Sequence, residues 1–187
     1  MLKKCLIGKI IQCHIDYSDP DSFVVGRLVH FNNDWFIMQD ISSAGCWNGL
    51  ALYMQSDIVS VNEFTDYICR IVSLIKCRNE PEQFIPPLSD DPLISILIYA
   101  RDSMRVVGIE LHKSGYRDIN GTIECLTSNT ICINQIDEFG RADGKSYISI
   151  DAITRCFMDD EESKCLEMLM QYESKAIDQP TVQLENN

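Results

Sequence analysis

The sequence lacks an apolar run long enough to span a membrane, a CxxC pair, and any cluster of lysine and arginine. A transmembrane helix needs about 20 consecutive apolar residues, so a helical membrane protein is excluded. The histidines His14, His30 and His112 are scattered, whereas zinc sites use closely spaced ligands. With 16 basic and 28 acidic residues the net charge is −12, which opposes binding to a phosphate backbone. We therefore expect that the protein does not associate with a membrane, binds no metal or cofactor, and makes no extended contact with nucleic acid.

Nine cysteines are present, an odd number with irregular spacing. The two closest, Cys125 and Cys132, are seven residues apart, and most lie among apolar residues, where cysteine acts as a small core side chain. The N-terminal segment MLKKCLIGKIIQC is interrupted by Lys9 and has no small-residue cleavage site. It is interpreted as the first structural element of a cytoplasmic protein.

The chain repeats a pattern of glycine and apolar residues after 95 positions. Its 187 residues and 45% hydrophobic content suit one ordinary domain or two small ones. Asn48-Gly49 aligns with Asp143-Gly144, and both dipeptides favour tight hairpin turns. The aligned identities are Gly26/Gly121, Ile41/Ile136, Gly45/Gly140, Gly49/Gly144 and Ile58/Ile153.

Alternating apolar and β-branched residues predict five short strands in each copy. Five bent strands can close into a small barrel without edges, so the fold class is mainly β, with two tandem five-stranded barrels and flanking helices. The predicted strands are Lys9–Asp16, Arg27–Phe31, Trp35–Ile41, Leu50–Met54 and Val59–Val61, then Met104–His112, Thr122–Leu126, Thr130–Ile136, Ser146–Ile150 and Thr154–Phe157.

One mismatch separates the copies. Leu50, Leu52 and Met54 are one residue out of phase with Ile148 and Ile150. A slip of one residue turns a strand over, so we expect a bulge or a compensating shift at this strand.

Helical spacing predicts a helix after each barrel. Asn62 is the predicted cap of the first helix and Glu63 suits its first turn. The acidic run Asp159–Glu162 favours the start of the second helix, or alternatively a site for a cation or a basic partner. The apolar positions are Phe64, Tyr67, Ile68, Ile71, Leu74 and Ile75, then Cys165, Leu166, Leu169 and Tyr172.

A segment rich in proline and acidic residues separates the two copies. Asp91-Pro92 then favours a helix start, with a helix over Leu93–Ser103, although LISILIY alone is also compatible with a strand. The predicted organisation is a first barrel with its helix (1–78), a linker (79–91), a second barrel with flanking helices (92–173) and a frayed tail (174–187).

This arrangement resembles the Sm-like fold, an SH3-like small β-barrel. Gly26-Arg27-Leu28 and Gly121-Thr122-Ile123 are similar to the start of that superfamily's first motif. The segment ISIDAI followed by Thr154-Arg155-Cys156 is similar to its second motif, a strand, a one-turn corner and a final strand. The resemblance covers most of the chain, as tandem copies of a bacterial branch. It implies ring assembly and binding of single-stranded RNA.

The residues that would contact RNA in such a protein are absent. Neutral or apolar residues replace the Asp and Asn of the first motif, and acidic groups replace the cations of the second, so the resemblance carries the fold without the nucleotide site. The positions are Asn32, Trp35 and Phe36 with the corner Gln55-Ser56-Asp57, and Thr127, Thr130 and Ile131 with the corner Asp151-Ala152.

Catalysis is not expected either. The glycine-containing stretch GRADG lacks the Lys-Ser/Thr of a phosphate loop and precedes a strand. The neighbours His112 and Asp118, like His30 and Asp34, are interpreted as solvated pairs at turns.

What remains is a surface. Phe139 and Trp47 lie in corresponding predicted loops, where an aromatic ring either contacts a partner or packs back onto its own barrel. We therefore predict a non-catalytic protein-interaction or assembly module, with self-association through free strand edges. An RNA-binding adaptor is the alternative, and a small-molecule site between the barrels is a third possibility.

Overall fold

The computed structural model describes residues 1–16, 19, 22–79 and 81–178. Ten strands form one antiparallel open sheet in the order β5-β1-β2-β3-β4-β10-β6-β7-β8-β9. The strands are β1 (Ile10–His14), β2 (Phe23–Phe31), β3 (Trp35–Ile41), β4 (Trp47–Met54), β5 (Ser60–Asn62), β6 (Val106–Leu111), β7 (Ile119–Leu126), β8 (Thr130–Ile136), β9 (Ala142–Ser149) and β10 (Ile153–Met158). The helices are α1 (Asp66–Arg78), α2 (Pro92–Asp102) and α3 (Glu161–Asp178), with 3₁₀ turns η1 (Lys4–Leu6), η2 (Gln55–Asp57) and η3 (Ile150–Ala152).

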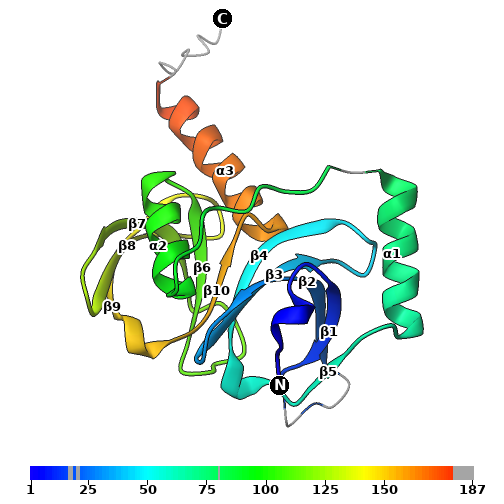
Figure 1. Cartoon of the computed structure of the whole chain (residues 1–187). Coiled ribbons are helices and arrows are strands. Elements are labelled where there is room, and N and C mark those ends of the chain that lie inside the picture. Colours follow the sequence, from blue (N-terminus) through cyan, green and yellow to red (C-terminus); the bar gives the residue numbers. More distant parts are fainter. Residues whose placement is uncertain (17–18, 20–21, 80, 179–187) are drawn as a thin grey trace, which may run out of the picture.

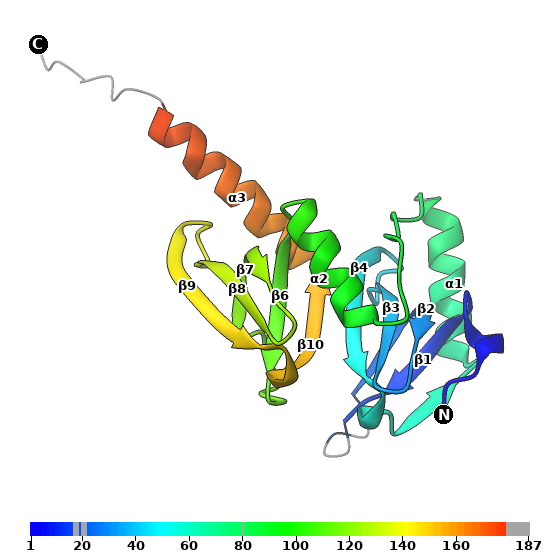
Figure 2. The same ribbon diagram turned by 60° about the vertical axis from the view of Figure 1, so that its left-hand side comes forward.

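The prediction of a mainly β protein with flanking helices is confirmed, but the ten strands do not form two separate barrels. Strand β4 of the first half pairs with β10 of the second, so the sheet runs through both halves (Figures 1 and 2). Their edges meet each other, and for that reason neither half closes on itself.

Several elements that are 95 residues apart in the sequence have matching bounds. This holds for β3 and β8, β4 and β9, and η2 and η3, and α1 and α3 begin at the same offset. Phe64 and Asp159, which precede these helices, both have a φ of 59°. Phe64 therefore lies outside the helix that its hydrophobicity suggested, and its side chain is exposed.

The predicted hairpin turns at the two Asx-Gly dipeptides are wrong. The turns lie at Ser42–Cys46 and Asp137–Arg141, where the Ser42 hydroxyl accepts from the Cys46 N–H and the Asp137 carboxylate accepts from the Arg141 N–H. Because these side chains close the turns, Asn48-Gly49 and Asp143-Gly144 fall inside β4 and β9, at bulges.

The apolar residues of β4 and β9 are one position out of phase, but the two strands do not differ in their pairing register. Each strand pairs with the preceding strand of its half in the same register, and the bulge is at the same place. Leu50 and Leu52 are buried in the main core, whereas Lys145 and Tyr147 at the corresponding positions of β9 are exposed. Strand β4 is covered on both faces and β9 on one, which explains the different patterns.

The helix boundaries are partly as predicted. Asp91 caps α2 by accepting from the Ile94 N–H at 3.1 Å, with Pro92 in the first turn. Helix α1 is capped by Thr65 rather than Asn62, because β5 extends to Asn62. Helix α3 continues to Asp178, so residues 174–178 of the predicted tail are helical, and residues 179–187 lie outside the described part.

Helix α2 lies over the boundary between the two halves (Figure 2). Its buried residues form one hydrophobic cluster with Ile37, Leu50 and Leu52 of the first half and Ile123 and Ile133 of the second. A second cluster lies within the first half, and a third packs α1 against β2, β3 and β4. The main core is thus shared between the halves.

The segment between α1 and α2 is packed on the sheet. The Gln83 side chain donates to the Trp47 carbonyl at 3.0 Å and accepts from the Gly49 N–H at 2.8 Å. The Gln83 carbonyl accepts from the Gln39 side chain at 3.1 Å. This segment therefore holds the bulged start of β4 in place.

Replacing Gln83 with alanine is expected to lower the free energy of unfolding by about 1–2 kcal/mol, because two partly buried hydrogen bonds are lost. Urea unfolding measures the effect. The control is Glu82→Ala, which removes an exposed ion pair to Arg27 and should cost less. An equal or larger loss for Glu82→Ala would contradict the role of Gln83.

Candidate functional site

The pairing of β4 with β10, called the seam below, joins the two halves. Leu50, Ala51, Leu52 and Tyr53 lie opposite Met158, Phe157, Cys156 and Arg155. Most of these side chains are apolar and buried, and β10 pairs with β6 on its other side. The seam is therefore a continuous part of the sheet and of the core.

Gly49 brings the two backbones of the seam into close contact. Its φ is +74°, and a Cβ atom there would lie 2.4 Å from the Asp160 nitrogen and from the Met158 carbonyl oxygen. The neighbouring Asn48 side chain accepts from the Glu161 N–H at 3.0 Å, at the start of α3. The bulge of β4 thus fits against the turn that leads into α3.

Arg117 holds this turn in place through ion pairs. Its guanidinium contacts the Asp160 carboxylate, lies 3.3 Å from Glu162 and sits 4.5 Å from the Phe157 ring centroid. A Cβ atom at Gly108 would lie 2.5 Å from this guanidinium, so glycine leaves room for it. The Arg117 side chain is only 13% exposed, which makes its acidic partners structurally necessary. The acidic run is thus used for ion pairs as well as at the helix start, where Asp160 accepts from the Ser163 N–H.

A cleft of about 500 Å³ opens beside the seam. Lys113 pairs with Asp57 at 2.5 Å, linking the halves, and Arg155 pairs with the buried Glu110 at 3.2 Å. The described lining holds no cysteine or histidine, and its cations are paired with carboxylates. The cleft lies between the two halves, which is the place considered above for a small-molecule site. Its ion pair between Lys113 and Asp57 joins the halves.

A buried carboxylate lies inside the first half. Asp40 Oδ2 accepts from the Tyr53 hydroxyl at 2.7 Å, and its Oδ1 is inaccessible and has no hydrogen-bond partner in the described chain. Burial raises the pKa of Asp40 to about 7, against a lowering by the Tyr53 hydrogen bond and a further rise from Asp160. Burial and the nearby Asp40 raise the pKa of Cys13 to about 12. Burial thus disfavours the charged form of both groups, and the Cys13 thiol is not activated as a nucleophile.

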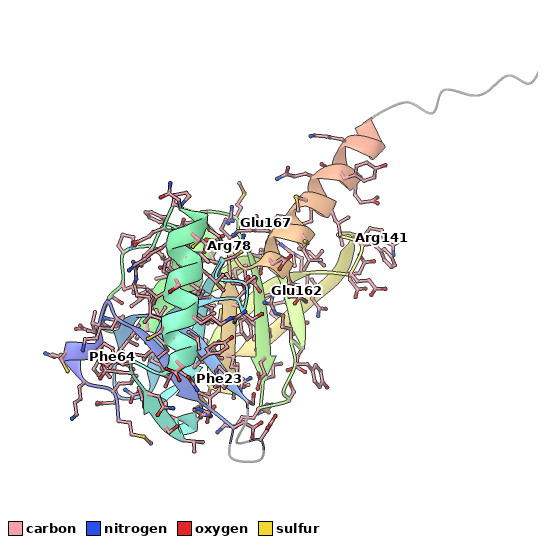
Figure 3. All side chains as sticks on the ribbon, turned by 90° about the vertical axis from the view of Figure 1, so that its right-hand side faces the viewer. Phe23, Phe64, Arg78, Arg141, Glu162 and Glu167 are labelled. Atoms are coloured by element: carbon pink, nitrogen blue, oxygen red, sulfur yellow. The ribbon has the colours of Figure 1, made fainter. Side chains whose placement is uncertain are left out.

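Strands β5 and β9 are the two ends of the sheet. Strand β9 has eight residues and an exposed Tyr147, whereas β5 has three. Figure 3 shows Phe64, which follows β5, and Arg141, which precedes β9, on opposite sides of the molecule. The two edges therefore face away from each other.

The two aromatic residues predicted to contact a partner have different surroundings. Trp47 begins β4 and is buried, with the Arg27 guanidinium 4.8 Å from its ring centroid. Phe139 lies in the β8–β9 turn and is 54% exposed, with Arg141 4.7 Å from its ring centroid. Of the two, Phe139 offers an accessible ring, and its role as a partner contact stays a prediction.

The positions that resemble RNA-contacting residues have structural roles here. The Asn32 side chain accepts from the N–H groups of Asp34 and Trp35, which closes the β2–β3 turn. Phe36 and Ile131 are fully buried in the core. Among the histidine–aspartate neighbours, the Asp118 carboxylate accepts from the Leu111 N–H and the Ser114 hydroxyl.

Asp40 and Arg117 were not identified from the sequence. Their partners lie on other elements, 13 and 43 positions away, which local patterns do not reveal. The available signal was Asp40 itself, which follows Phe36 and Met38 on the same buried face of β3.

Within the described residues, no group of three or more histidine, cysteine or acidic side chains is placed to hold a metal ion. In that same part of the chain, no helix has the length and apolarity to cross a bilayer.

The sequence and the fold were then compared with known proteins. No protein-family model, no curated protein and no solved structure matches this chain.

Proposed function

We propose that this protein is a non-catalytic assembly module of two tandem Sm-like units, which associates with a second copy of itself through the sheet edges β9 and β5. The seam carries the proposal. In it, β4 accepts β10, and the strands 95 residues away from these two are β9 and β5. The seam within one chain is therefore the same type of contact that the free edges of β9 and β5 can form with a second copy.

The register of the seam defines the proposed contact. Moving each residue by 95 positions places Tyr147 opposite Val61 and Lys145 opposite Glu63 of the second copy. The Asn48–Glu161 hydrogen bond becomes one from the Asp66 N–H to Asp143. Lys145 and Glu63 are opposite in charge and Tyr147 and Val61 form an aromatic–β-branched pair, which supports the proposal, whereas Asp66 and Asp143 bring two acidic residues together.

The edge contact is weaker than the seam. Polar Lys145 and Ser146 replace Leu50 and Ala51, and an edge lysine opposes strand addition. Association is therefore reversible and depends on protein concentration, rather than producing a permanent oligomer.

A charge-swap cycle tests the register. Lys145→Glu and Glu63→Lys each place like charges opposite one another and should weaken association several-fold, and the double variant should restore it. Sedimentation equilibrium across the micromolar range measures the dissociation constant, and thermal unfolding of dilute samples controls for the intrachain pairs Lys145–Glu124 and Lys9–Glu63. A wild-type mass that stays monomeric at high micromolar concentration would refute self-association.

The RNA-binding adaptor is the competing proposal and rests on the resemblance. It requires salt-sensitive binding of uridine-rich or adenine-rich oligonucleotides tighter than about 1 μM, because non-specific contacts lie at about 10⁻⁴–10⁻⁶ M. Fluorescence anisotropy on the same samples separates the two functions.

A further inference from the structure

Two cysteines lie opposite each other on adjacent strands in the second half of the sheet. Cys125 on β7 is the register partner of Cys132 on β8, beside a bulge at Glu124. Cys125 is exposed and Cys132 is buried. In the pairing registers of the described strands, no other two cysteines are opposite.

This placement satisfies the main geometric requirement of a disulfide. Opposed residues of an antiparallel pair have Cα atoms about 4.5–5.5 Å apart, and disulfides span Cα separations of about 4.4–6.8 Å. Their Cβ atoms lie about 4.5–5.5 Å apart, whereas a relaxed disulfide has about 3.8 Å. Closing the bond draws the strands together by roughly 1 Å, which makes it strained and easily reduced.

The two thiols have different environments. The Cys132 thiol donates to the Glu124 carboxylate at 3.6 Å, and that carboxylate pairs with Lys145 of β9. Burial, the Glu124 hydrogen bond and its charge raise the pKa of Cys132, so this residue is not the one that an oxidant attacks first. An oxidant in solution reaches Cys125 first because its side chain is exposed.

We propose that Cys125 and Cys132 form a reversible disulfide that is made by a hydroperoxide and broken by a dithiol reductant. The Cys125 sulfur attacks the peroxide, the O–O bond breaks, and a sulfenic acid and an alcohol or water result. The Cys132 sulfur then attacks the Cys125 sulfur, the S–O bond breaks and water leaves with the Cys132 proton. The two thiols lose two electrons in total, and the peroxide gains them. The proposal is independent of self-association.

Intact-mass spectrometry with hydrogen peroxide tests it. Wild type should lose two hydrogens, protect two thiols from alkylation and give a crosslinked peptide of Cys125 and Cys132, all reversed by dithiothreitol. Cys125→Ser should abolish the loss of two hydrogens. The control Cys69→Ser/Cys77→Ser removes two other exposed thiols, on α1, and should leave the crosslink unchanged.

Cys132→Ser provides the second readout. Without its resolving partner, Cys125 should accumulate as a sulfenic acid that dimedone traps, whereas wild type should show little trapping. Two outcomes would overturn the proposal: wild type that retains both thiols or over-oxidises Cys125 without a crosslink, and a loss of two hydrogens that is undiminished in Cys125→Ser.

Discussion

Alanine in place of Gly49 is expected to lower the free energy of unfolding by about 2–5 kcal/mol. A left-handed backbone costs a non-glycine residue about 1–2 kcal/mol, and overpacking adds about 1–3 kcal/mol. The added Cβ would lie 2.4–2.5 Å from backbone atoms of Met158, Asp159 and Asp160, which cannot rotate away as a side chain can. Urea unfolding followed by circular dichroism measures the loss.

Gly144 provides the matched control, because it lies 95 residues later with a φ of +86° and no atom within 4 Å of an added Cβ. Gly144→Ala should therefore cost only the backbone term of about 1–2 kcal/mol. The difference between the two variants reports on the seam. Equal losses would mean that the bulge of β4 does not pack against the turn before α3.

Replacing Asp40 with asparagine is expected to stabilise the protein above pH 7 and to flatten its pH profile. The pKa of Asp40 is about 7 in the folded chain against 3.8 for a free side chain. The folded state therefore holds a proton that the unfolded state releases, and stability from this group is lost as the pH rises from about 4 to 7. At 1.36 kcal/mol per pKa unit the gain at pH 8 is at most about 4 kcal/mol, reduced because the amide N–H groups lack an acceptor.

Subtracting the variant's profile from that of wild type isolates Asp40. This is necessary because the paired Glu82, Glu124 and Asp137 have lowered pKa values and act oppositely, losing stability as the pH falls. Tyr53→Phe removes the hydroxyl that donates to Asp40 and should destabilise more at pH 8 than at pH 5. A difference profile that is flat between pH 4 and 7 would show that Asp40 is ionised in the folded protein.

Local features of the fold were predictable because their causes are local. Strand β8 has the predicted bounds, and Asp91-Pro92 starts α2, since alternation and capping act within a few residues. The turns at Ser42–Cys46 and Asp137–Arg141 were missed because a serine or aspartate side chain closes each turn, and the Asx-Gly signal describes a bulge equally well.

The seam was not predicted because it joins residues about 100 positions apart. Its signal was present in the phase mismatch of β4, where Leu50 and Leu52 add a second apolar face. A strand that is apolar on both faces is covered on both, whereas the corresponding Lys145 and Tyr147 indicate a solvent-facing surface. A separation of 43 positions likewise concealed the pair of Arg117 and Asp160, whose charges are informative only once the fold brings them together.

The seam also determines the order in which the protein folds during its synthesis. A ribosome finishes β4 long before it reaches residues 153–158, so the apolar strand waits without its neighbour while the second half is translated. At roughly 5–20 residues per second this interval lasts about 5–20 s, long enough for a nascent chain to meet another on the same messenger RNA. During this interval the unpaired edge of β4 favours association between incomplete chains, a contact that the finished seam prevents.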